Sequence, residues 1–125
     1  MAPAELCRSY LVSFATADPA AVVAHVTDDF VNEHTAALGD GSRGRGAYLA
    51  RLPGFMAAMP GLRYEVEDVI ADGARVAAAY TLHATVNSRP VAVRGMMRFE
   101  VRDGLIAKRV DYWDSLVFQR QAGLA

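Results

Sequence analysis

The 125-residue sequence contains a single cysteine, Cys7, so it cannot form an intrachain disulfide. No apolar run approaches the length needed to span a bilayer, and no repeat or low-complexity tract is present. The two signs of charge nearly cancel, since 13 basic residues stand against 14 acidic ones for a net charge of -1, and no sequence-wide field attracts nucleic acid or an anionic membrane. The N-terminal residues lack the basic and apolar regions of a secretory signal peptide. These absences predict a cytoplasmic protein with no nucleic-acid or membrane partner.

The sequence also lacks the residue spacings that bind metals or phosphates. Its three histidines, His25, His34 and His83, fall on separate predicted elements and form no His-x-x-x-His pair. The segment Arg-Gly-Arg-Gly at 43–46 has neither the lysine nor the spacing of a P-loop. We therefore expect no metal and no cofactor.

Hydrophobic residues, in contrast, make up 53% of the chain, against 22% charged residues. The length fits one domain, residues 1–125, with a single core. Because this hydrophobic share is high for a soluble monomer, part of the apolar surface is expected to face a cavity or a second copy of the chain. The composition predicts a pocket protein that forms a homodimer.

Three helices are predicted in the first half of the chain. Leu6, Tyr10 and Phe14 recur at helical spacing within residues 3–17 and form one apolar stripe, which points Tyr10 inward. Asp18 is the expected N-cap of a short second helix that starts at Pro19. A flexible loop, Gly39–Gly46, precedes a third helix over 48–59, which should kink or split at its internal Pro-Gly pair.

The remaining segments alternate as strands. A brief strand at 30–34 places Phe30 and His34 on one face, with Asn32 between them. Four long antiparallel strands are expected at 62–71, 74–86, 90–101 and 105–116, joined by tight turns. The predicted order is α-α-β-α-β-β-β-β.

The last strand leaves two carboxylates as candidates for the interior. Regular alternation places Tyr112 and Asp114 on one face. Lys108 breaks the apolar pattern and indicates a bulge, which would exchange the faces and turn Asp111 and Trp113 inward instead. The alternation alone does not decide between Asp111 and Asp114.

This element order, together with Thr-Asp-Asp-Phe at 27–30 and Asp-Gly at 103–104, resembles the nuclear transport factor 2-like superfamily over almost the whole chain. The resemblance implies an α+β fold, a cone-shaped barrel in which a strongly curved, mostly antiparallel sheet wraps a long helix around an apolar pocket. It also implies pairing of protomers through the outer sheet face. Members include ketosteroid isomerases, SnoaL-like polyketide cyclases and domains that only bind ligands, so the fold alone does not settle function.

Two branches of the superfamily suggest site residues. Counted from Asp18, the oxyanion-hole tyrosine of ketosteroid isomerases falls on Tyr10 and their general base falls on His34, while their second oxyanion donor falls near Gly95, which cannot donate from a side chain. The SnoaL-like branch places an acid/base aspartate seven residues before the glutamine of a Gln-Leu-Gly signature. Asp114 stands at that spacing from Gln121.

The resemblance therefore implies an acid–base site formed by His34, Asp114 and Tyr10. A neutral imidazole can take a proton, a carboxyl in an apolar cavity can donate one, and a phenol can hydrogen-bond an oxygen on which charge develops. The side chains expected to line the pocket are Phe14, Phe30, Leu52, Met56, Tyr80, Met97, Phe99, Tyr112 and Trp113. Two functions remain open: an isomerase-, cyclase- or dehydratase-type enzyme acting on a small lipophilic oxygenated molecule, or a binding or accessory domain without chemistry. A buried polar cluster in the pocket would favour the enzyme.

Overall fold

The structure, a computed structural model, describes all of residues 1–125. Its helices are α1 (Pro3–Ser13), the 3-10 turn η1 (Phe14–Thr16), α2 (Pro19–Val23), α3 (Arg45–Ala58) and α4 (Ser115–Gln121). Its strands are β1 (Val26–His34), β2 (Ser42–Arg43), β3 (Arg63–Asp72), β4 (Arg75–Val86), β5 (Arg89–Arg102) and β6 (Leu105–Trp113). The strands form one sheet in the order β2-β1-β6-β5-β4-β3, in which only β1 and β6 run parallel.

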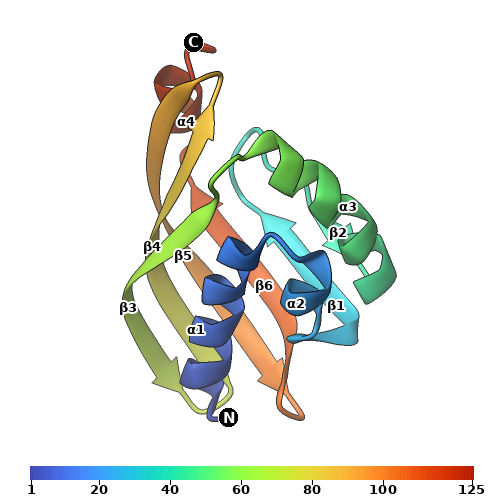
Figure 1. Cartoon of the computed structure of the whole chain (residues 1–125). Helices are drawn as coiled ribbons and strands as arrows, with labels where there is room; N and C mark the ends of the chain where they lie inside the picture. The colour runs from blue at the N-terminus through green and yellow to red at the C-terminus, as the bar shows by residue number, and fades with distance from the viewer.

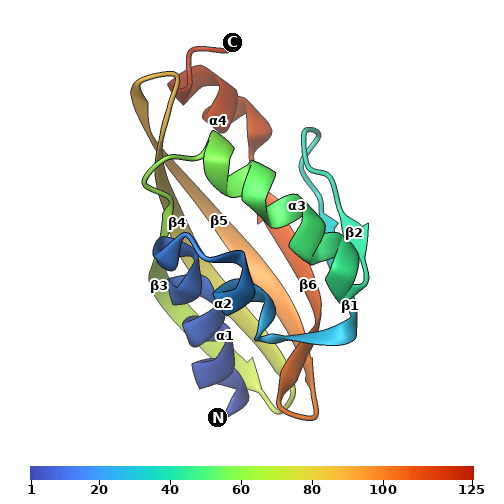
Figure 2. The same cartoon turned by 45° about the vertical axis from the view of Figure 1, so that its right-hand side comes forward.

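The helices α1, α2 and α3 all lie against one face of this sheet, which curves around them (Figures 1 and 2). The apolar stripe of α1 is buried as expected: Leu6, Tyr10 and Phe14 are each at most 3% exposed. Asp18 caps α2 by accepting a hydrogen bond from the backbone N–H of Ala20, which confirms the predicted helix start. The expected α+β fold with a curved, mostly antiparallel sheet is confirmed. No helix is both long enough and apolar enough to cross a membrane.

Two elements were not predicted. Ser42–Arg43 within the glycine-rich loop pairs with β1 as the short strand β2. The last strand ends at Trp113 rather than continuing to 116, because the Asp114 carboxylate accepts hydrogen bonds from the N–H groups of Leu116 and Val117 and so starts α4. The element order is therefore longer than predicted by one strand and one helix.

The third helix is continuous over Arg45–Ala58, with Pro53 inside it, so the expected split is wrong. A proline removes one backbone donor from a helix. Here the residue is exposed, and Tyr48 and Leu52 are buried in the core, which holds the helix against the sheet.

The predicted bulge in the last strand is confirmed. Glu100 pairs with Lys108 and Val101 pairs with Ile106, so Ala107 has no partner on β5. Beyond the bulge the alternation is shifted by one residue, which buries Arg109 and Asp111 and leaves Tyr112 42% exposed.

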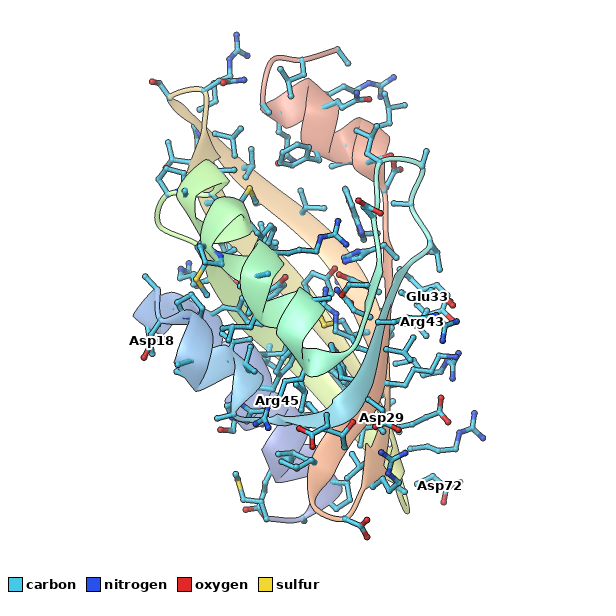
Figure 3. The ribbon with its side chains drawn as sticks, turned by 90° about the vertical axis from the view of Figure 1, so that its right-hand side faces the viewer. Asp18, Asp29, Glu33, Arg43, Arg45 and Asp72 are labelled. Atoms are coloured by element: carbon cyan, nitrogen blue, oxygen red, sulfur yellow. The ribbon has the colours of Figure 1, made fainter.

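Charged side chains of β1 and β2 lie on the other side of the sheet. Figure 3 shows Glu33 of β1 and Arg43 of β2 pointing away from α3. Because side chains alternate along a strand, their neighbours Asn32 and Ser42 point toward the helices. Both β1 and β2 therefore contribute polar residues to the concave face.

Candidate active site

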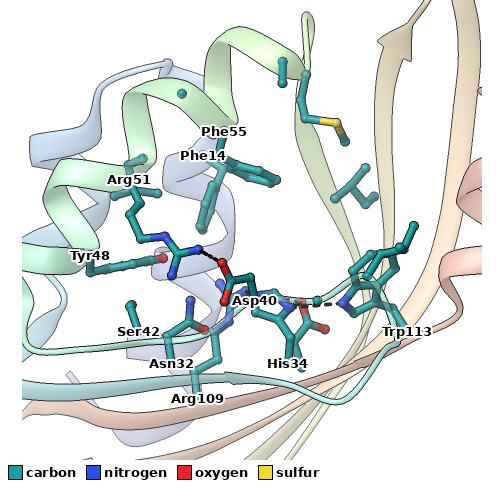
Figure 4. A pocket seen from close by; sticks show the side chains of 18 of the residues that line it. Phe14, Asn32, His34, Asp40, Ser42, Tyr48, Arg51, Phe55, Arg109 and Trp113 are labelled. Atoms are coloured by element: carbon teal, nitrogen blue, oxygen red, sulfur yellow. Dashed lines mark hydrogen bonds and ion pairs between the residues drawn. The ribbon is translucent and has the colours of Figure 1, made fainter.

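A cavity of about 660 Å³ lies between α3 and the concave face of the sheet (Figure 4). Most of its wall is apolar or aromatic and comes from η1, α3, β3, β4, β5 and α4. Its polar side chains come mainly from β1, β2 and β6, with Asp40 and Arg51 forming an ion pair of 2.5 Å between the 35–41 loop and α3. The cavity is thus apolar on most sides, with polar groups concentrated on the three strands at one side of the sheet.

Asp111 is the buried carboxyl group of this cavity, with the residue only 3% exposed. The Tyr80 hydroxyl donates a hydrogen bond of 2.6 Å to one of its oxygens, and Arg109 Nη2 donates one of 3.3 Å to the other. Burial raises the pKa of Asp111, while the charge of Arg109 and the hydrogen bond from Tyr80 act in the opposite direction. Asp111 is therefore a carboxyl group whose affinity for a proton is increased by its surroundings.

His34 lies beside Asp111, with Nδ1 at 3.7 Å from the nearer carboxylate oxygen. Trp113 donates a hydrogen bond of 3.0 Å from its indole nitrogen to the same Nδ1, whereas Arg109 Nη2 lies 3.4 Å from Nε2. The shorter contact assigns the ring proton to Nε2, since Nδ1 must accept. Burial, and then the charges of Arg109 and Arg51, lower the pKa of His34 to about 4. His34 is thus neutral at neutral pH, and its basic nitrogen is already occupied by Trp113.

Arg109 links this pair to two phenols. Its Nη1 donates a hydrogen bond of 2.6 Å to the Tyr10 hydroxyl, and that hydroxyl lies 2.5 Å from the hydroxyl of Tyr48. The only acceptor beside the fully buried Tyr10 hydroxyl is the Tyr48 oxygen, because Arg109 can only donate. Directing the Tyr10 proton to Tyr48 satisfies both groups and leaves the Tyr48 proton free to point elsewhere. Tyr48 lines the cavity, whereas Tyr10 is fully buried behind it. Burial raises the pKa of Tyr48 well above its usual value, so it stays a protonated donor.

Gly95 makes room for the hydroxyl that holds Asp111. It stands between Tyr80 on β4 and Trp113 on β6 in the sheet register. A Cβ atom at this position would overlap the Tyr80 hydroxyl group and lie 2.8 Å from the carbonyl oxygen of Tyr112. The absence of a side chain therefore lets the Tyr80 ring cross β5 and reach the carboxylate.

The structure brings some of the predicted site residues together and separates others. His34, Phe14, Leu52, Tyr80 and Trp113 line the cavity as expected. Asp114 does not: it is exposed and caps α4, so the interior carboxylate of the last strand is Asp111.

Several expected lining residues lie elsewhere because they pack in the core or face outward. Phe30, Met97 and Phe99 are fully buried in the core, Met56 packs at the edge of the core, and Tyr112 lies on the outer face after the bulge. Tyr10 reaches the site only through the hydroxyl of Tyr48 and the guanidinium of Arg109.

Arg109, Tyr48 and Asn32 were not predicted as site residues. The pattern Arg-x-Asp-x-Trp at 109–113 could have predicted that Arg109 faces the cavity. The bulge that turns Asp111 inward also turns Arg109 inward, because the two residues share one face of the strand. Tyr48 and Asn32 carried no signal beyond their positions on predicted elements.

Comparison with known proteins identifies the family. The sequence profile of the SnoaL-like domain matches residues 7–109. The chain belongs to the SnoaL-like family. No curated protein matches this SnoaL-like chain.

Solved structures similar to this SnoaL-like protein share its whole fold. A protein from Catenulispora acidiphila with a ketosteroid isomerase-like fold, crystallised with trimethylamine, has a TM-score of 0.89 at 17% identity, over 97% of this chain and 94% of its own. A candidate polyketide cyclase from Xanthomonas campestris has a TM-score of 0.79 at 24% identity, over 96% of each chain. An LEH-like epoxide hydrolase from M. tuberculosis has a TM-score of 0.81 at 25% identity, over 95% of this chain and 88% of its own. The predicted superfamily is confirmed, and these neighbours associate its fold with enzymes that act on small molecules.

Proposed function

We propose that this SnoaL-like protein is an acid–base enzyme that moves a proton on a small lipophilic, oxygenated molecule bound in the cavity. The observation that carries the proposal is the position of Asp111: a buried carboxyl group, 3% exposed, on the wall of an otherwise mainly apolar cavity. A carboxyl group with a raised pKa exchanges protons with carbon and oxygen acids more readily than an exposed one. A domain that only binds apolar ligands has no need for such a group.

In the proposed reaction, the Asp111 carboxylate takes a proton from a carbon next to a carbonyl group of the ligand. The electron pair of the broken C–H bond moves into the carbonyl, and the Tyr48 hydroxyl donates a hydrogen bond to the oxygen on which negative charge develops. Protonated Asp111 then returns the proton, to another carbon in an isomerisation or to a departing hydroxyl in a dehydration. Tyr48 thus takes the role that the resemblance implied for Tyr10.

His34 remains neutral in this scheme. Its pKa of about 4 and its hydrogen bond from Trp113 argue against a role as the base at neutral pH. Its neutral ring lies in a fixed position beside Asp111 and adds no second positive charge next to the carboxylate. The family and the M. tuberculosis neighbour, named as an epoxide hydrolase, support small-molecule chemistry in this cavity.

The test is exchange of carbon-bound protons with solvent. The protein is incubated in D₂O with a panel of cyclic ketones, and loss of the proton signal next to the carbonyl is followed by NMR. We expect Asp111→Asn to reduce the exchange rate by about 100- to 10,000-fold, the usual contribution of a positioned acid or base. Asp114→Asn, which preserves a helix cap on the surface, is the matched control and should keep the wild-type rate.

An Asp111→Asn protein that exchanges at the wild-type rate would contradict the proposed role. Ketones that bind in the cavity of the wild-type protein without any exchange would instead support the alternative, a non-catalytic ligand-binding domain.

We also propose that the protein forms a homodimer through the outer face of its sheet. Met96 and Tyr112 are register partners on β5 and β6, and they are 41% and 42% exposed on that face. Adjacent large apolar side chains on a surface favour contact with a partner. A second copy presents the same pair and is the simplest complement.

A further inference from the structure

Three polar side chains of the cavity wall each have a buried atom without a hydrogen-bond partner in the protein. These atoms are Asn32 Oδ1, Ser42 Oγ and Arg109 Nε. All three residues line the cavity, and Asn32 and Arg109 are 8% and 4% exposed. Because buried polar atoms are almost always hydrogen-bonded in folded proteins, three such atoms at one site call for a common explanation.

The sheet register places the three residues in one row. Asn32 is the Cα partner of Ser42 across β1 and β2, and it is also the partner of Arg109 across β1 and β6. Side chains of such partners stand beside one another on the same face of a sheet. Figure 4 shows Ser42, Asn32 and Arg109 following one another along one wall of the cavity.

The donor and acceptor character of the three unpaired atoms determines which ligand group can bind them. Asn32 Oδ1 can only accept a hydrogen bond, Arg109 Nε can only donate one, and a serine hydroxyl can do either. A ligand carbonyl would satisfy Arg109 and Ser42 but leave the Asn32 oxygen unpaired, and a carboxylate would add a lone pair facing that oxygen. Of these three ligand groups, only a hydroxyl both donates and accepts, so it can pair with all three atoms, as a water molecule would.

We propose that the row formed by Ser42, Asn32 and Arg109 is a binding subsite for a hydroxyl group of the ligand. The substrate class is therefore a ring compound that carries a hydroxyl group in addition to the carbonyl at which the proton is moved. The other atoms of Arg109 are already engaged with Tyr10 and Asp111, so the guanidinium is held in place for this contact.

A second row gives the position of the hydroxyl relative to the reacting carbon. His34 and Asp111 are also register partners on β1 and β6, two residues further along each strand than Asn32 and Arg109. Two residues of a strand span roughly 7 Å, which is about the extent of two fused six-membered rings. This placement rests on the acid–base function proposed above, whereas binding of the hydroxyl itself does not.

The test compares two probes that differ only in the group in question, 2-naphthol and 2-methylnaphthalene. Their affinities are measured by NMR titration for the wild-type protein, Asn32→Leu, Ser42→Ala and the control Ser13→Ala, a buried serine that bonds the backbone of α1 outside the cavity. The ratio of the two affinities within each protein cancels the difference in hydration between the probes. We expect Asn32→Leu to lower the preference for the naphthol by about tenfold and Ser42→Ala by about threefold, with no change in Ser13→Ala.

A second readout locates the contact. The side-chain amide signals of Asn32 should shift on addition of 2-naphthol and not on addition of 2-methylnaphthalene. An affinity ratio that is the same in the wild-type protein, Asn32→Leu and Ser42→Ala would overturn the proposal, because the row would then hold only water that the ligand does not replace. Absence of binding by both probes would overturn it as well.

The same titration with Asp111→Asn separates the two proposals. A preference for the naphthol that depends on Asn32 and persists in Asp111→Asn supports the hydroxyl subsite whatever the outcome of the exchange assay. Loss of exchange in Asp111→Asn without any dependence of binding on Asn32 would support the acid–base function and overturn the subsite.

Discussion

At the scale of single residues, burial drives both titratable groups at the centre of the cavity toward their neutral forms. It raises the pKa of Asp111 and lowers that of His34 to about 4. Arg109 acts against burial at Asp111 but in the same direction as burial at His34. The charge of Arg109 thus favours the ionised form of Asp111 and, together with burial, disfavours the charged form of His34.

The lowered pKa of His34 predicts a pH dependence of stability. Between its unfolded pKa near 6.5 and its folded value of about 4, the unfolded chain binds a proton that the folded chain does not, so stability falls as the pH falls through this window. We expect this group to contribute about 2 kcal/mol of the loss between pH 7.5 and pH 4.5. Urea unfolding of the wild type and His34→Gln at both pH values measures it, because the variant lacks this loss. Equal losses in the two proteins would contradict the assignment.

Gly95 predicts a second effect at this scale. In Gly95→Ala the new Cβ must displace the Tyr80 ring, which costs about 1–3 kcal/mol for an overpacked site and removes a hydrogen bond from Asp111. Urea unfolding measures the loss, and the exchange rate with ketones should fall with it. Gly46→Ala, at an exposed position of α3 outside the cavity with no atom within contact distance, is the control and should be neutral or stabilising. Equal stability of the two variants would contradict the packing described here.

At the scale of elements, a short polar side chain decides where β6 ends and α4 begins. Asp114 satisfies two backbone N–H groups of the first turn of α4, which contains only seven residues. We expect Asp114→Ala to destabilise the protein by about 1 kcal/mol and to speed hydrogen exchange at the N–H groups of Leu116 and Val117. Asp114→Asn should remain close to wild type, since asparagine caps helices as well as aspartate. If these two N–H groups exchange as slowly in Asp114→Ala as in the wild type, tertiary contacts alone hold α4.

At the scale of the whole molecule, the outer face of the sheet predicts the oligomeric state. Sedimentation velocity should show a dimer, and Tyr112→Lys should shift it to monomer, because a lysine on each copy would place like charges in an apolar contact. Val117→Lys introduces the same charge at an exposed apolar position of α4, outside the proposed interface, and should leave the dimer intact. A monomeric wild type would exclude the proposed interface.

Local patterns predicted much of this molecule because they depend on neighbouring residues alone. The helical spacing of Leu6, Tyr10 and Phe14 gave the inward face of α1, and Asp18 before Pro19 gave the start of α2. Two mistakes, the missed β2 and the missed α4, concern short elements of two and seven residues, which depend on a single pairing or cap. A pattern of a few residues is too short to exclude the competing loop or strand.

The sequence by itself determined the fold class, the family, the course of the long strands and the two carboxylates that could face the interior, since periodicity and turn residues are properties of the local chain. Only the tertiary structure decided for Asp111 over Asp114, because the choice depends on whether β6 bulges at Ala107 against β5. It also decided that Ser42, Asn32 and Arg109 form one row, because β2, β1 and β6 are adjacent in the sheet although Arg109 lies far along the chain from the other two. Strand order and register are set by long-range pairing, which no local pattern specifies.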